Sequence, residues 1–317
     1  VAMYRSSYKH YFSKSKMKLQ SDPFEFAIPI LSIDEELADS LLKAGGLKKG
    51  LDKTFKRIDK KGKPKSMDLP FKCNLISNMV NNDMTSENVL GFVEGSDLKD
   101  ELLIVTAHYD HIGKHGDVIF YGADDDGSGT TALLMMAEAF SKAKEKGEGP
   151  RRSILFMPVS AEEKGLLGSR YYSENPIFPL ESTVADLNID MIGRIDEPHE
   201  GNPDYVYIIG SNFLSTELHN INEEQNKLHT QLQLDYTFNS TDDPNNFYRR
   251  SDHYNFAKHG IPVIFYFNGV HEDYHQPSDT VDKIDFNKLS KITRLVYYTA
   301  WDIANKDKRL VVDGNIK

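Results

Sequence analysis

Histidine and carboxylate side chains with the chemistry of metal ligands are gathered in five short pieces of this sequence. The pieces are His108-Tyr109-Asp110, Asp124-Asp125-Asp126, Glu162-Glu163, Asp190 and His275. Each piece lies at or near the end of an apolar run. Its polar side chains are therefore not explained by packing in the core. Imidazole nitrogen and carboxylate oxygen are the ligands that zinc and harder divalent cations take in proteins. Together the pieces predict a metal-dependent hydrolase.

The elements expected around these pieces alternate between strand and helix. We expect strands over 73–79, 88–94, 102–107, 153–159, 184–189, 205–209 and 261–267, and helices over 130–143, 166–172, 216–228 and 286–305. Such alternation is typical of the α/β class, here a single twisted, mixed but mostly parallel sheet with helices on both faces. Ligands of such sheets bind beyond the carboxyl ends of the strands. Four of these strands would deliver polar groups to that edge.

Three parts of the chain differ in composition. Residues 1–45 are predicted to form a separate unit, in which Asp34 caps a helix over 35–44. Lysines and glycines make 46–68 resemble a linker or an exposed hairpin. Residues 69–317 would form the main domain. Because the chain opens with Val1 and carries no signal peptide, we expect that upstream sequence has been removed.

Composition excludes several classes of function. The chain has 38 basic and 48 acidic residues and a net charge of −10. Without a basic block, this argues against a nucleic-acid or anionic-membrane surface, whereas a charged amino terminus would be attracted. No run of 18 apolar residues exists, so no membrane span is expected. Cys73, the only cysteine, excludes an intrachain disulfide and a thiolate zinc knuckle, and its alternating neighbours favour a buried side chain.

The triple aspartate stands just before a predicted helix, and Gly122, Gly127 and Gly129 flank it. The glycines allow tight turns, and the free amides of a helix N-terminus stabilise carboxylates. An acidic helix cap is the alternative interpretation, for which Asp126 alone would suffice. Because three consecutive aspartates repel one another, we expect at least one of them to face a cation.

The five pieces occur in the order found in the co-catalytic two-zinc aminopeptidase family, which the chain resembles over roughly residues 70–305. That family includes bacterial leucyl aminopeptidases, glutamate carboxypeptidase II and, as a divergent branch, glutaminyl cyclases. The resemblance implies two zinc ions per chain, bridged by Asp125. It implies Glu163 and His275 as further ligands of one ion. For the other ion it implies His108 and Asp190.

The resemblance also implies roles for neighbouring carboxylates. Glu162 would be the general base that takes a proton from the water bridging the two ions and so leaves a bridging hydroxide, and Asp110 would hold the ring of His108. Asp126 would shape the loop of the bridging aspartate, where the family has an unusual peptide geometry. Three ligand carboxylates against two Zn²⁺ leave one positive charge, which the hydroxide would neutralise. A solvated Glu162-Glu163 pair is the alternative.

Other histidines and the substrate pocket are less sharply defined by sequence. His111 has the chemistry of a ligand, but the family motif uses His108. His253 begins a helix in a segment that resembles a pocket lining, so we expect it in the pocket and prefer His275 as the ligand. Phe247 and Tyr248, in an aromatic and acidic loop over 235–250, would favour apolar first residues of a substrate. The same loop could equally be a surface Ω-loop.

The N-terminal unit has a resemblance of its own. Residues 28–42 are similar to the end of the protease-associated domain that often accompanies these peptidases, so only a part of such a domain would be present. Taken together, the resemblances imply a secreted or periplasmic zinc aminopeptidase acting on peptides with a free N-terminus. The alternatives are a single-zinc glutaminyl cyclase, a carboxypeptidase or dipeptidase in which Arg249 or Arg250 binds a substrate carboxylate, and a non-catalytic binding domain.

Overall fold

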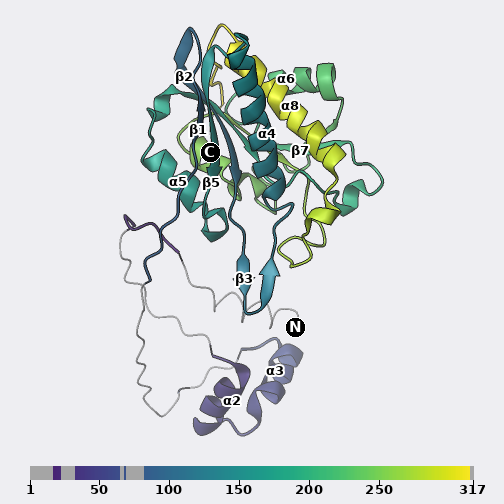
Figure 1. Cartoon of the computed structure of the whole chain (residues 1–317). Coiled ribbons are helices and arrows are strands. Elements are labelled where there is room, and N and C mark those ends of the chain that lie inside the picture. Colours follow the sequence, from purple (N-terminus) through teal and green to yellow (C-terminus); the bar gives the residue numbers. More distant parts are fainter. Residues whose placement is uncertain (1–16, 23–32, 65–67, 69–81, 315–317) are drawn as a thin grey trace. The chain divides into compact units, whose positions relative to one another are not determined.

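The computed structural model describes residues 17–22, 33–64, 68 and 82–314. The chain divides into two compact units (Figure 1), one containing Ser21–Met84 and the other containing Thr85–Lys317 together with Met17–Gln20. The predicted strand over 73–79, with Cys73, lies outside the described residues, as do residues 28–32 of the segment that resembles a protease-associated domain. We describe each unit by itself.

The described part of the first unit consists of two helices, α2 (Glu35–Ala44) and α3 (Gly50–Lys61). Helix α2 has its predicted bounds, and the Asp34 carboxylate accepts a hydrogen bond of 2.8 Å from the amide of Leu37. The prediction of a linker or hairpin over 46–68 is wrong where α3 forms. Leu51, Phe55 and Ile58 recur there at helical spacing with no interrupting proline, which outweighs the many lysines.

The second unit is built on one sheet. Within 82–314, seven strands pair in the order β1-β5-β2-β6-β9-β7-β8. Their bounds are Gly91–Val93 (β1), Leu98–His108 (β2), Arg152–Val159 (β5), Thr183–Ile189 (β6), Tyr205–Ile209 (β7), Gln233–Asp235 (β8) and Val263–Phe267 (β9). The central strands β5, β2, β6 and β9 are parallel, and β8 is parallel to β7. Strands β1 and β7 run antiparallel to β5 and β9, so the predicted mixed, mostly parallel sheet is confirmed.

Helices cover both faces of this sheet. They are α4 (Gly127–Glu145), α5 (Leu167–Glu174), α6 (Thr216–Gln225, continued by a π-helical turn Asn226–Thr230), α7 (His253–Ala257) and α8 (Phe286–Asn305). Helices α4 and α8 lie side by side on one face, with α6 beside α8 (Figure 1). Helices α5 and α7 pack against each other, and α7 contacts β6 and β9. The central strands are therefore buried on both faces.

Successive residues of β2 point alternately to the two faces of the sheet. Leu103 and Val105 belong to the apolar cluster that includes α4, α6 and α8. Leu102 and Ile104 belong to a second cluster, which includes Tyr172 of α5 and side chains of α7. Since both faces of the strand are filled by apolar packing, polar side chains are left to the strand's end. This packing fixes where the candidate ligands can lie.

A small hairpin follows β2 and was not predicted from the sequence. Strands β3 (Gly113–His115) and β4 (Val118–Phe120) pair antiparallel to each other. Their residues are mostly exposed, so no buried face marks them in the sequence. The hairpin carries the chain from the end of β2 to the triple aspartate. No helix in the described part of the chain combines the length and apolar character needed to span a bilayer.

Candidate metal centre

All five predicted metal ligands meet at the carboxyl edge of the sheet. His108 is the last residue of β2, and Asp190 directly follows β6. Glu163 lies in a short 3₁₀ turn (Glu162–Lys164) after β5. Asp125 lies in the loop before α4, and His275 lies in the loop after β9. Five segments thus bring their side chains to one place.

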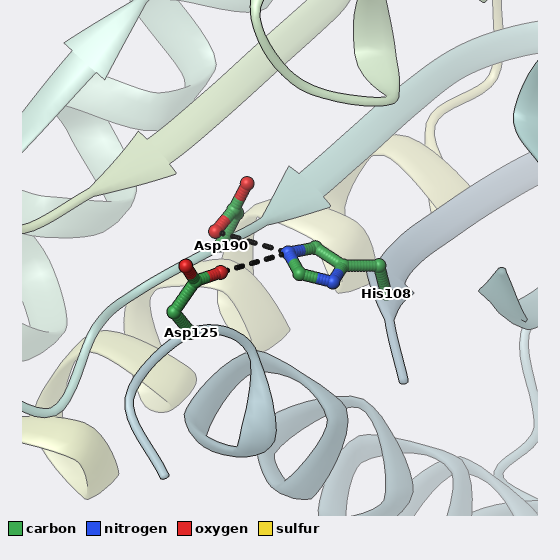
Figure 2. A group of neighbouring side chains, drawn as sticks. All are labelled: His108, Asp125 and Asp190. Atoms are coloured by element: carbon green, nitrogen blue, oxygen red, sulfur yellow. Dashed lines mark ion pairs between the residues drawn. The ribbon is translucent and has the colours of Figure 1, made fainter. Parts of the chain in front are cut away.

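One group of side chains surrounds the Nε2 atom of His108 (Figure 2). This atom lies 3.2 Å from Oδ1 of Asp125 and 3.5 Å from Oδ1 of Asp190. The other ring nitrogen, Nδ1, lies 2.9 Å from the backbone carbonyl of Asp110. Because a carbonyl can only accept, Nδ1 carries a proton and donates it, which leaves Nε2 as the ring nitrogen available to a metal ion. Although burial acts in the opposite direction, the carboxylates of Asp190 and Asp125 raise the pKa of His108 well above its ordinary value.

A second group surrounds Glu163. Its Oε1 lies 3.3 Å from Nε2 of His275, which is 3.1 Å from Oδ2 of Asp125. His111 joins the same group, with Nδ1 3.0 Å from Oε1 of Glu163 and 3.8 Å from Oδ2 of Asp125. Asp125 therefore presents one oxygen to His108 and the other to the second group. This is the arrangement expected of a carboxylate that bridges two metal ions.

Unpaired buried atoms test whether these residues fit a metal. Within the described residues, five buried atoms of the two groups have no hydrogen-bond partner: Nε2 of His108, both ring nitrogens of His111, Oδ2 of Asp125 and Oε1 of Glu163. Buried polar atoms are nearly always hydrogen-bonded, so such a concentration needs an explanation. Imidazole nitrogens and carboxylate oxygens converging without hydrogen bonds fit a divalent cation, and zinc in particular.

The aspartates that flank Asp125 hold the loop in place. Oδ1 of Asp126 accepts hydrogen bonds from the amides of Gly129 (2.8 Å) and Met191 (3.1 Å), and its Oδ2 accepts one of 3.1 Å from the amide of His108. It is thus the helix cap of α4 and also a brace for two ligand-bearing strands. The Asp125–Asp126 peptide bond is cis, matching the unusual geometry that the family resemblance implies. Only the middle aspartate faces the candidate metal positions.

Asp110 acts differently from the sequence prediction. Its carboxylate lies 3.9 Å from Nδ1 of His108, too far for a hydrogen bond, so it is the backbone carbonyl that holds the ring. The carboxylate instead accepts hydrogen bonds from the amides of Glu162 (3.0 Å) and Glu163 (3.4 Å). This difference arises because the chain turns sharply after β2. Asp110 therefore positions both the ring and the Glu162–Glu163 turn.

Glu162 lies beside the first group, with Oε2 4.0 Å from Nε2 of His108. Burial is the main cause that raises the pKa of Glu162 well above its ordinary value, and negative charge on Asp252 adds to it. The second glutamate behaves oppositely: despite burial, the imidazoles of His111 and His275 lower the pKa of Glu163 to about 2. Adjacent glutamates with opposed pKa shifts suit a proton carrier next to a permanently ionised ligand.

A cleft opens onto these groups. Its lining combines the candidate ligands and base with apolar and aromatic side chains: Asp125, Glu162, Glu163, Asp190, Met191, Phe247, Arg250, Phe265, Phe267, Val270, Tyr274 and His275. Phe247 is in the cleft as predicted. The cleft therefore has charged side chains at the candidate metal positions and aromatic side chains beside them.

The other two predicted pocket residues do not line the cleft. Tyr248 is buried against Phe213, with ring centroids 4.7 Å apart. His253 is wholly buried and stacks behind Phe265 at 4.8 Å, and burial lowers its pKa to about 3, so its ring is neutral. Neighbouring residues of a helical turn point in different directions, so Tyr248 turns away from the cleft although Phe247 lines it. His253 belongs to a separate helix, α7, whose first residue is buried behind the aromatic side chains of the cleft.

Two functional residues next to His253 were missed. Ser251 donates a hydrogen bond of 2.7 Å to Oδ2 of Asp190. Asp252 is fully buried and accepts a hydrogen bond of 2.5 Å from Ser169, and burial raises its pKa to about 7. Both stand in the segment Arg250-Ser251-Asp252-His253, which drew attention for its histidine. The polar pair Ser251-Asp252, directly before the histidine, was the feature of the sequence that could have indicated their role.

The fold and the site define an α/β protein with a paired histidine–carboxylate metal centre at the carboxyl edge of a mostly parallel sheet. The sequence profile of the family described as Peptidase family M28 matches residues 88–300 of this chain. The chain belongs to that family.

Individual relatives agree with this assignment. The chain is 27% identical over 235 residues to "Aminopeptidase YwaD" of Bacillus subtilis (strain 168), covering 72% of this chain and 47% of the relative. It is 37% identical over 105 residues to "Probable glutamate carboxypeptidase LAMP1" of Arabidopsis thaliana, covering 33% of this chain and 14% of that protein. The chain thus spans less than half the length of these two proteins.

A solved structure shares the fold. "The structure of BSAP, a zinc aminopeptidase from Bacillus subtilis" superposes with a TM-score of 0.56 at 24% identity. The match covers 70% of this chain and 51% of that chain. It confirms the α/β architecture predicted from the sequence.

Proposed function

We propose that this chain is the catalytic part of a zinc-dependent aminopeptidase that binds two zinc ions. The observation that carries the proposal is the Asp125 carboxylate, which presents Oδ1 to the His108 group and Oδ2 to the Glu163 group. Membership of Peptidase family M28 supports peptide-bond hydrolysis, and the relatives' names supply the aminopeptidase class. Zinc is proposed as the metal because the similar solved structure is described as a zinc aminopeptidase.

The ligands divide between two positions. His108 and Asp190 would hold the first zinc ion, and Glu163 and His275 the second, with Asp125 shared between them. Bound zinc supplies Lewis acidity, which polarises the substrate carbonyl and lowers the pKa of the attacking water. The buried carboxylates and the ring of His108, held through its Nδ1, already converge where such a cation would lie.

Glu162 is the group that moves the proton. Its carboxylate takes a proton from the attacking water and returns it to the amine that leaves, as a general base and then a general acid. Burial favours its protonated form, which helps it retain the proton until the peptide bond breaks. The two hydrogen bonds to the Asp110 carboxylate fix the turn from which Glu162 projects.

The cleft favours peptides with a free amino terminus and an apolar first residue. Phe247, Phe265 and Phe267 supply the apolar wall for the first side chain, and the names of the aminopeptidase relatives support the free amino terminus. Arg250 lines the same cleft, with its guanidinium 4.8 Å from the ring centroid of Phe247. This arginine favours a second candidate, a peptidase that recognises a substrate carboxylate.

The decisive experiment pairs metal analysis with a substrate assay. We expect about two zinc ions per purified chain and hydrolysis of leucine-p-nitroanilide that a chelator abolishes and zinc restores. N-acetyl-leucine-p-nitroanilide is the control and should resist cleavage. Cleavage of an N-blocked dipeptide with a free carboxylate, in place of the amine substrate, would favour the carboxylate-recognising candidate. A single zinc ion without hydrolysis would contradict the aminopeptidase proposal.

Glu162→Gln separates proton transfer from metal binding. The amide has the size of the carboxylate but cannot accept the proton, so we expect kcat to fall by about 10²–10⁴-fold. Zinc content should stay at the wild-type value. The matched variant Glu163→Gln, one residue along, should lower zinc content instead. If Glu162→Gln kept near wild-type turnover, the assignment of the base would be wrong.

A further inference from the structure

We infer that His111 is an additional zinc ligand at the second metal position, beside Asp125, Glu163 and His275. The inference rests on the proposed function and extends it, because the five ligands implied by the family motifs do not include His111. The residue lies three positions after His108, at the start of the turn that leads into the β3–β4 hairpin.

The position of the ring is the first observation. Nδ1 of His111 lies 3.0 Å from Oε1 of Glu163 and 3.8 Å from Oδ2 of Asp125. The ring stands edge-on to that of His275, with centroids 5.9 Å apart and planes inclined by 71°. The side chain is only 8% exposed. Ligand atoms of His111, Asp125 and Glu163 all lie within 4.8 Å of one another, close enough to share one ion.

The second observation is that the close approach is not a hydrogen bond. Neither ring nitrogen of His111 has a hydrogen-bond partner among the described residues, and Oε1 of Glu163 has none either. At 3.0 Å the two atoms are near enough, so the direction of the N–H group is what fails. Buried polar atoms without a hydrogen-bond partner are rare, and a cation bound by both atoms would satisfy them.

The loop is shaped around this ring. Gly122, where the hairpin returns to the triple aspartate, has φ of +63°. A Cβ atom there would collide with the His111 ring and with the carbonyl of Asp125. Only glycine allows the backbone to pack against the imidazole while keeping Asp125 in place. His115, in the same hairpin, is exposed.

An extra ligand makes the two metal positions unequal. The first position has three protein ligands, which leaves coordination open for water and substrate, as in catalytic zinc sites. The second position would have four, two of them imidazoles, as in tightly held sites. We therefore expect the second position to fill first and to retain its ion longest during chelation.

The test measures zinc binding rather than activity. Calorimetric titration of metal-free wild-type chain should resolve a tight and a weaker zinc ion. His111→Ala should weaken the tight ion at least tenfold and alter the visible spectrum of the cobalt-substituted chain. His115→Ala, which removes an exposed imidazole from the same hairpin, should stay within twofold of wild type. Unchanged affinity and an unchanged cobalt spectrum in His111→Ala would overturn the inference.

Two further variants distinguish a ligand from a hydrogen-bond donor that merely positions Glu163. His111→Asn keeps a donor near Glu163 but loses the imidazole, so it should bind zinc as weakly as His111→Ala. Recovery of wild-type affinity in His111→Asn would overturn the ligand role. His275→Ala should keep a weakened second ion through His111, and the double variant should bind one ion only. Equal second-ion affinity in His275→Ala and the double variant would likewise overturn it.

The same samples separate this inference from the proposed function. If zinc binding responds to His111→Ala but wild-type chain does not hydrolyse leucine-p-nitroanilide, the aminopeptidase proposal fails and the ligand assignment stands. If the wild-type chain is active and binds two zinc ions whose affinities do not change in His111→Ala, only the inference fails.

Discussion

Ser251 links the first metal group to the interior of the sheet. Its hydroxyl donates a hydrogen bond of 2.7 Å to Oδ2 of Asp190 and accepts one of 2.8 Å from the side-chain amide of Asn188. Thr106 of β2 in turn donates one of 2.7 Å to the side-chain oxygen Oδ1 of Asn188. All four residues are buried. Asp190 is thereby oriented with Oδ1 toward His108, which a ligand needs before the metal arrives.

Ser251→Ala should therefore weaken zinc binding at the first position. Loss of a partner that orients a ligand typically costs about 10–100-fold in metal affinity. Competition with a chromophoric chelator would measure this. Ser173→Ala is the matched control, because its buried hydroxyl donates to the backbone carbonyl of Arg170, in helix α5. An effect in the control equal to that of Ser251→Ala would show that general destabilisation is responsible.

At the residue scale, the sequence predicted which side chains lie close together but not the orientation of each one. His108, Asp125, Glu163, Asp190 and His275 come together because each stands at or beyond the end of a buried strand or before a helix, positions that hydrophobic patterning reveals. The orientations of His111 and Tyr248 depend on short, irregular turns. Such turns are set by tertiary packing, for example the contact of Gly122 with the His111 ring, which periodicity does not encode.

Among the elements, helix α8 is tied to strand β7 through a buried lysine. The Lys288 ammonium donates hydrogen bonds to the carbonyls of Pro203 (3.1 Å) and Tyr205 (2.7 Å) and lies 3.5 Å from the centroid of the Tyr205 ring. The side chain is 2% exposed. Burial lowers the pKa of Lys288 to about 7, although nearby aspartates, Asp124 first among them, act in the opposite direction.

This lysine should make stability depend on pH. The unfolded chain keeps the proton up to the ordinary pKa of 10.5, whereas the folded chain releases it near 7. Between these values the unfolded state binds more protons, so stability contributed by Lys288 rises with pH. Relative to Lys288→Met, the wild-type free energy of unfolding should increase by about 1 kcal/mol per pH unit between 7.5 and 9.5. Urea denaturation at several pH values would measure it, and parallel curves for both proteins would refute the prediction.

Element boundaries show where sequence patterns are strong. Helix α8 and strand β7 have their predicted bounds, because long amphipathic and fully apolar runs leave little choice. Helix α3 was missed since its lysine-rich surface masked three apolar residues at helical spacing. Strands β3, β4 and β8 have three residues each. Segments so short are selected by pairing with a neighbour rather than by their own pattern.

At the scale of the molecule, the described residues of Thr85–Lys317 contain both apolar clusters and every candidate ligand. The family match, over 88–300, falls within the same range. The metal centre and the packing that supports it thus belong to one unit. The excess of 48 acidic over 38 basic residues, however, is a property of the whole chain.

That excess should act on substrates at a distance. Bound zinc would offset most of the negative charge of the ligands, so the field felt by an approaching peptide comes largely from the remaining acidic surface. Such a field speeds the approach of cations and slows that of anions, and salt screens it over about 10 Å at 0.1 M. Raising ionic strength from about 20 to about 200 mM should lower kcat/KM several-fold for Leu-Lys-amide.

The matched peptide Leu-Glu-amide, with the same first residue and a negative charge on its second, should show little change in kcat/KM over the same range. Since the chemical step is common to both peptides, kcat should be insensitive to salt for each of them. Zinc content measured at both ionic strengths controls for loss of metal. Equal salt dependence of kcat/KM for the two peptides would show that substrate capture depends on the local groups of the cleft and not on the −10 charge of the chain.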